Sequence, residues 1–215
     1  MMEIVTRSGS LKMDKQKMKS NEKAEVILKA AMEEFLSNGY AATSMNSIAS
    51  TAGVSKATLY SYFQDKEGLF IALFNELVKK RFNDVLTPKL LETSNDDPKI
   101  VLKSLMQELY LTISSNRNLL DFLRLMIGES GRFPELARIH IIELVQPTVD
   151  LLSNYLNHQT QLVIRDSEAT ARIIIGSLGN FIILQEILGG NDVMPFDYER
   201  MIDTLVNLID CQQKK

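Results

Sequence analysis

Apolar residues recur at intervals of three and four along most of the chain, which is the spacing of an amphipathic helix. The first such stripe covers residues 23–38 and ends at Gly39, because glycine readily adopts the left-handed backbone that closes a helix. Two short helices, 45–52 and 55–62, are predicted next, with the break at Gly53 between them. The pattern therefore predicts a small group of three helices near the N-terminus.

Longer apolar stripes continue through the rest of the chain. The pattern predicts further helices over 65–86, 99–115, 118–130, 134–157, 167–188 and 197–211. Residues 162–164 could form a strand by composition, but the sequence offers no second strand-like segment with which they could pair. The predicted fold class is all-α, with about nine helices: an N-terminal three-helix domain followed by a C-terminal helical bundle.

Charge divides the chain into parts of opposite sign. Residues 1–66 carry nine basic and seven acidic side chains, whereas residues 67–215 carry 15 basic and 20 acidic ones, and the net charge is −3. Residues 1–20 are rich in lysine and poor in large apolar side chains, so we expect a flexible basic arm there. The predicted domains are this arm, a unit over 21–66 and a larger unit over 67–215.

Several classes of protein are disfavoured by the composition. No apolar run reaches the length of a signal peptide or a membrane span, and the single cysteine, Cys211, argues against a disulfide framework. The histidines His140 and His158 lack metal-ligand spacing, and no phosphate loop or nucleophile motif occurs. We expect a cytoplasmic, non-enzymatic protein without a cofactor, metal site or membrane association.

The two short helices and the turn at residues 52–54 are typical of a helix-turn-helix unit. The segment over residues 39–69 reads GYAATSMNSIASTAGVSKATLYSYFQDKEGL. Its most characteristic motifs are Ile48-Ala49, Ala52-Gly53-Val54-Ser55, Thr58-Leu59-Tyr60, Tyr62-Phe63 and Lys66-Glu67. Over residues 24–74 the chain resembles the DNA-binding domain of the tetracycline-repressor family. The remaining chain is similar to that family only in the number and length of its helices and in a loose motif near residues 124–136.

The resemblance and the chemistry of these side chains together give a set of candidate DNA contacts. The set comprises Ser44, Asn46, Ser55, Lys56, Ala57, Thr58, Tyr60, Tyr62 and Lys66. Lys56 lies where a recognition helix meets base edges and is expected to contact guanine or phosphate. The tyrosines offer hydroxyls to phosphates, and the resemblance implies a phosphate contact for Lys66. Alternatively, the serines are only helix caps, Tyr60 packs internally and Lys66 is merely solvated.

The last two predicted helices, 167–188 and 197–211, have unusually wide apolar surfaces. Small residues such as Gly176 and Gly179 would allow another helix to approach closely. We expect these helices to pair with those of a second copy in a four-helix homodimer interface, as the resemblance also implies. A monomer with a large core is the alternative.

A cavity for a largely apolar effector is expected where the helices of the bundle converge. Its predicted wall consists of Phe82, Leu86, Met106, Tyr110, Phe122 and Met126. Arg124, Glu129 and His140 are candidate polar anchors for the effector. Ordinary core packing and internal charge pairs explain these residues equally well.

The sequence thus predicts a dimeric transcriptional repressor that binds a palindromic operator in double-stranded DNA and is released by a small molecule. Two alternatives remain open. One is an activator, or a regulator controlled by a protein partner, and the other is a helical small-molecule-binding protein without operator specificity.

Overall fold

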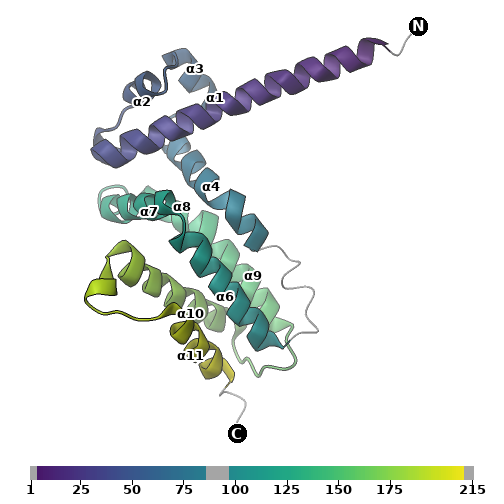
Figure 1. Ribbon diagram of the computed structural model, residues 1–215, viewed down its shortest axis with the longest axis vertical. Coiled ribbons are helices and arrows are strands. Elements are labelled where there is room, and N and C mark those ends of the chain that lie inside the picture. The colour runs from purple at the N-terminus through teal and green to yellow at the C-terminus, as the bar shows by residue number, and fades with distance from the viewer. Residues whose placement is uncertain (1–3, 86–96, 211–215) are drawn as a thin grey trace. The chain divides into compact units, whose positions relative to one another are not determined.

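The computed structural model describes the backbone of residues 4–85 and 97–210, and the side chains of 21–78 and 97–209. Within these ranges the chain forms ten α-helices and no strand, and two of the helices, over residues 134–140 and 146–157, are joined by a π-helical turn into one continuous helix, so the all-α class and the predicted count of about nine helices are confirmed. Figure 1 shows the arrangement of these helices along the chain. Two compact units are present, Met1–Leu73 and Phe74–Lys215. The division falls inside a helix, slightly beyond the predicted boundary at residue 66.

The N-terminal unit contains α1 (Ile4–Ala42), α2 (Met45–Thr51), α3 (Lys56–Tyr62) and the beginning of α4 (Lys66–Val85). Its core is a set of fully buried side chains contributed by all four helices. They include Ile27, Phe35, Ile48, Leu59, Leu69 and Phe70. Because Leu69 and Phe70 belong to this core, the first turns of α4 are part of the N-terminal unit.

Helix α1 differs from its predicted extent at the N-terminal end. The structure continues the helix back to Ile4, where the sequence analysis expected a flexible arm over residues 1–20. Residues 11–20 contain no Gly or Pro and several good helix formers, so helix propensity supports this extension. At the other end, Gly39 has φ 75° and ψ 166°, which interrupts the helical geometry at the predicted position.

The C-terminal unit begins with three helices, α6 (Pro98–Ser114), α7 (Arg117–Glu129) and α8 (Pro134–His140). A π-helical turn, η1 (Ile141–Val145), joins α8 directly to α9 (Gln146–Asn157). Asp97 and Asn116 cap α6 and α7, and Pro98 occupies the first turn of α6. These local signals explain why the predicted helix starts agree closely with the structure.

The unit ends with α10 (Ser167–Ile182), the π-helical turn η2 (Ile183–Ile187), the short η3 (Gly190–Asp192) and α11 (Tyr198–Asp210). Helix α10 packs along α9, and α11 packs along α6. Among the described residues, the stretch 167–187 is long and apolar enough to cross a membrane. Within the protein, 28% of its apolar 18-residue segment is buried. A helix that packs against other helices passes the same test, so this is weak evidence of a membrane span.

Candidate nucleic-acid interface and ligand cavity

The two short helices of the N-terminal unit are held by side-chain caps. The Ser44 hydroxyl accepts a hydrogen bond from Ser47 N at 3.0 Å, and the Ser55 hydroxyl accepts one from Thr58 N at 3.0 Å. Between the helices, Gly53 has φ +64°, a backbone conformation that side chains with a Cβ rarely adopt. Both serines therefore act as caps, and this role leaves their exposed surfaces accessible.

Helix α3 presents a polar surface to solvent. Lys56, Ala57 and Tyr60 are exposed, while Leu59 on the opposite side is fully buried. Tyr60 is 51% exposed, which contradicts the alternative that it is a packing residue. Of the other candidate contacts, Ser44, Asn46 and Ser55 are exposed, and Thr58 and Tyr62 are half-buried. The helix can therefore offer several hydrogen-bonding groups to a DNA groove.

Lys66 is engaged inside the protein. Its ammonium group donates hydrogen bonds to the backbone oxygens of Tyr40 at 2.7 Å and Thr43 at 2.9 Å, and lies 3.4 Å from that of Ala41. The same Nζ sits 4.3 Å from the centroid of the Tyr40 ring. A cation is favourable at the carbonyl end of a helix and over an aromatic face. Lys66 thus ties the start of α4 to the end of α1, and its expected phosphate contact stays a prediction.

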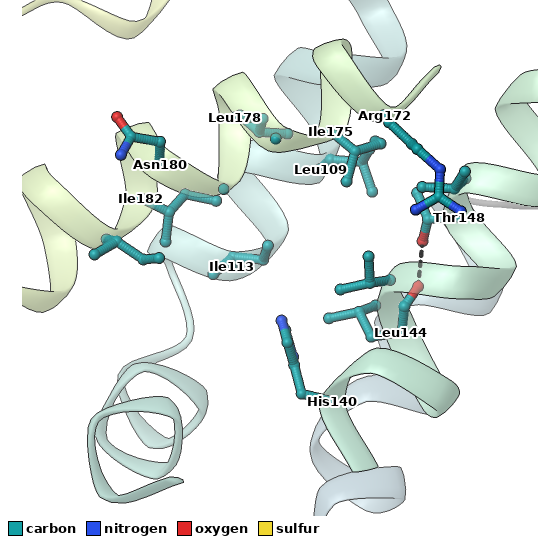
Figure 2. Close-up of a pocket in the computed structure, with 15 residues that line it drawn as sticks. Leu109, Ile113, His140, Leu144, Thr148, Arg172, Ile175, Leu178, Asn180 and Ile182 are labelled. Atoms are coloured by element: carbon teal, nitrogen blue, oxygen red, sulfur yellow. Dashed lines mark hydrogen bonds between the residues drawn. The ribbon is translucent and has the colours of Figure 1, made fainter. Parts of the chain in front are cut away.

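A cavity of about 430 Å³ lies within the C-terminal unit, between α6, the α8–η1–α9 segment and α10–η2 (Figure 2). Most of its wall is aliphatic. The lining residues are Leu109, Ile113, His140, Leu144, Val145, Thr148, Val149, Arg172, Ile175, Gly176, Leu178, Gly179, Asn180, Ile182 and Ile183. The volume falls in the range of small-molecule sites, about 300–1,000 Å³. Both π-helical turns contribute to the wall, and such turns often occur at functional sites.

Few polar groups face the cavity. The hydroxyl of Thr148 donates to Leu144 O at 2.7 Å, and the Arg172 guanidinium is paired with Glu168 at 2.8 Å. His140 Nδ1 is buried, and within the described residues it has no hydrogen-bond partner. Burial lowers the pKa of His140, because a low-polarity environment disfavours the charged ring. Asn180 also lines the cavity, but it is exposed to solvent. The cavity is therefore mainly apolar, and His140 supplies its buried imidazole.

Of the wall predicted from sequence, the four members whose side chains the structure describes do not line this cavity. Met106, Phe122 and Met126 are buried in the core, and Tyr110 donates to the Glu186 carboxylate at 2.7 Å. Burial, followed by the Glu186 contact, raises the pKa of Tyr110 above its ordinary value. The side chain of Phe82 and the whole of Leu86 lie outside the described residues. A stripe of apolar positions marks which residues are buried, but it does not show where packing leaves space.

The three candidate polar anchors have different positions. Arg124 donates to the backbone oxygens of Glu186 and Ile187 and pairs with Asp121, so it closes the end of the α10–η2 segment. Glu129 does not line the cavity. His140 alone of the three does. Among the described residues no group of three or more potential metal ligands is found.

Sequence reasoning missed most of the cavity, although one signal was present. At Gly176 and Gly179 on α10, an added Cβ would meet no atom within 4 Å. Both glycines line the cavity, and the role that the sequence analysis gave them, close approach of a second copy, stays a prediction. Two glycines spaced three residues apart inside an apolar helix were therefore the signal that could have located the wall.

Helices α10 and α11 and the segment between them keep large apolar side chains on the surface of the single chain. These side chains are Ile173, Ile183, Leu188, Val193, Met194, Phe196 and Leu208. Leu188 and Leu208 are 68% and 62% exposed. Such a concentration of exposed apolar residues is typical of a protein–protein contact.

Two family models match this chain. Residues 27–73 match the model of bacterial regulatory proteins of the tetR family, and residues 101–209 match the C-terminal domain of AefR-like transcriptional repressors. Together the two models cover the helix-turn-helix unit and nearly all of the bundle described above.

Individual proteins agree with the models. The uncharacterized HTH-type transcriptional regulator YuxN of Bacillus subtilis is 30% identical over 110 residues, which are 51% of this chain and only 36% of YuxN. The solved structure of the flavonoid-responsive regulator FrrA is 30% identical, has a TM-score of 0.67, and covers 88% of this chain and 95% of FrrA. The Bacillus subtilis regulator FadR in complex with stearoyl-CoA shares the fold, with a TM-score of 0.66 and 22% identity over 86% of this chain and 97% of FadR.

Proposed function

Because the chain belongs to the tetR family of bacterial regulatory proteins, we propose that it is a dimeric repressor released from operator DNA by a small molecule. The protein is a transcriptional regulator with a DNA-binding helix-turn-helix. The relatives are regulators rather than enzymes, so we propose a non-catalytic, cytoplasmic role.

The exposed surface of α3 is the observation that carries the DNA-binding proposal. Lys56 and Tyr60 are accessible on a short helix whose opposite side is anchored by Leu59. One such helix reads only a few base pairs, so two copies related by a two-fold axis are needed for a specific site. The exposed apolar residues of α10 and α11 supply a surface on which the second copy can pack. A near-palindromic operator follows from this symmetry.

The cavity supports control by a largely apolar effector. Its wall is mainly aliphatic, and its volume of about 430 Å³ suits a small organic molecule. FrrA is described as flavonoid-responsive, and FadR was solved with stearoyl-CoA, so relatives of this fold respond to or bind organic ligands. Occupation of the cavity would favour a conformation with weaker operator affinity, by a factor of about 5–150 for a typical coupling.

Selection of bound sequences from a random DNA library, at a stated salt concentration, tests the proposal. We expect enrichment of a near-palindrome whose half-sites are about one helical turn apart or multiples of it. Binding to random DNA with no enriched motif would contradict operator recognition. Footprinting of the selected site with candidate effectors would then show whether a ligand releases the protein.

A further inference from the structure

The cavity contains a side chain whose hydrogen-bonding capacity the protein does not use. His140 lies at the end of α8, and its Nδ1 is buried without a partner among the described residues. The nitrogen at the tip of the ring points into the cavity, toward the space between Ile113 and Leu144 (Figure 2). A polar group in an apolar wall is stabilised when a ligand gives it a hydrogen bond, and the nitrogen that a ligand in the cavity can reach is the one at the tip of the ring rather than the buried Nδ1. His140 therefore marks where a polar group of a ligand would be placed.

The charges around the cavity indicate what kind of polar group fits. His140 and Arg172 are the ionisable residues among those that line it. The histidine is neutral because burial lowers its pKa, and Arg172 is paired with Glu168 on the same helix by hydrogen bonds of 2.8 and 2.9 Å. A ligand carboxylate or ammonium would thus meet no uncompensated opposite charge in an apolar surrounding, which is unfavourable. The cavity suits an uncharged ligand.

A neutral imidazole has one nitrogen that donates and one that accepts a hydrogen bond. A hydroxyl group can do either, so it suits the cavity-facing nitrogen of His140 in both tautomers. We propose that His140 is the polar anchor of the cavity, and that the effector is an uncharged, mainly apolar molecule whose hydroxyl group hydrogen-bonds to it. This inference rests on the proposed function, because it takes the cavity to be the effector site.

His140 also contacts the helix that leads toward the DNA-binding unit. Its ring packs edge-on against Phe74 of α4, with 6.1 Å between ring centroids and an interplanar angle of 81°. Phe74 in turn lies 6.1 Å from the Phe122 ring. Helix α4 contributes residues to both compact units. A ligand that is hydrogen-bonded to the imidazole holds the ring against Phe74. Binding in the cavity is thereby coupled to the position of α4.

Calorimetric titration of the full-length protein with three matched probes tests the anchor. The probes are 4-hexylphenol, hexylbenzene and 4-hexylbenzoate, which carry a hydroxyl group, no polar group and a negative charge. We expect 4-hexylphenol to bind about fivefold more tightly than hexylbenzene, as one added hydrogen bond implies, and 4-hexylbenzoate to bind most weakly.

Substitutions then assign the preference to one residue. In His140→Phe the preference for the phenol should disappear, while hexylbenzene binds at least as tightly as before. His140→Gln keeps a hydrogen-bonding side chain and should retain part of the preference. His158→Phe is the matched control, because His158 is exposed and does not line the cavity. Thermal unfolding of each variant verifies that it is folded.

Three results would overturn the inference: the phenol preference persists in His140→Phe, 4-hexylbenzoate binds most tightly, or none of the probes binds. The proposed function fails separately. If the His140-dependent preference is found but no probe changes operator affinity, the anchor stands and the effector role of the cavity fails. If a ligand releases the operator equally from wild type and His140→Phe, the regulator stands and the anchor fails.

Discussion

Individual side chains in this protein have roles that depend on whether their polar groups are already satisfied. Lys56 and Lys66 are both lysines of the DNA-binding unit, yet the first is exposed and the second donates to backbone oxygens of residues 40 and 43. An ammonium group that is held internally stabilises the fold, whereas an exposed one is available to release counterions from DNA. The two lysines should therefore respond differently to the same substitution.

Lys56→Ala is expected to change which bases are preferred at one position, or to reduce the slope of log K against log salt by about one, according to whether Lys56 reads a base or a phosphate.

Lys66→Ala is expected to lower the stability of the N-terminal unit by about 1–3 kcal/mol, because it leaves carbonyl groups without their charged donor. It should weaken binding to all DNA sequences with little change in slope. Salt-dependent binding combined with thermal unfolding measures both effects. A slope reduced by about one in Lys66→Ala would instead support the phosphate contact implied by the family resemblance.

At the scale of single elements, α10 both packs the bundle and leaves space within it. Its glycines at 176 and 179 line the cavity, and nothing occupies the position of an added Cβ at either. Glycine inside a helix costs about 1 kcal/mol relative to alanine. The helix thus gives up some intrinsic stability at two positions in the cavity wall.

Gly179→Leu should fill part of the cavity. We expect higher thermal stability and at least tenfold weaker binding of 4-hexylphenol. Because α10 also carries part of the proposed pairing surface, analytical ultracentrifugation is used to verify that the variant is still a dimer. Gly128→Leu on α7 is the matched control, because it removes a helical glycine with equally open surroundings that does not line the cavity. If both variants lost ligand binding equally, the cavity would not be the binding site.

At the scale of the whole molecule, two-fold pairing is what converts a short recognition helix into a specific DNA binder. The exposed apolar residues of α10 and α11 are the surface that we propose for that pairing. Full burial of one leucine side chain contributes about 1.5–3 kcal/mol to the free energy of association. In a two-fold symmetric interface the same residue is buried on both copies, so this contribution is made twice.

Leu208→Glu should therefore shift the protein from dimer to monomer and weaken operator binding at least a hundredfold, because two carboxylates would be buried without partners. Analytical ultracentrifugation measures the oligomeric state, and a gel-shift assay measures DNA affinity. Ile100→Glu on α6 is a close control, since Ile100 is also 62% exposed but lies on another helix. Dimers that survived Leu208→Glu intact would place the interface elsewhere.

The sequence by itself determined the helices, the turn at Gly53 and the caps at Ser44 and Ser55. These features depend on residues three or four positions apart, so spacing and side-chain type are enough to predict them. The same local rules predicted α3, and its role as the helix that meets DNA stays a proposal. The extent of α1 differed because sequences rich in lysine are compatible with both a helix and an arm.

Only the tertiary structure decided which groups meet across long separations in the chain. The Lys66 ammonium reaches Tyr40 O 26 residues away, and Tyr110 finds Glu186 76 residues away. Likewise, the cavity is formed by three separate helical segments, and the placement of His140 in its wall depends on all of them. A hydrophobic pattern records that a side chain is removed from water, but the space left between packed helices follows from their mutual geometry.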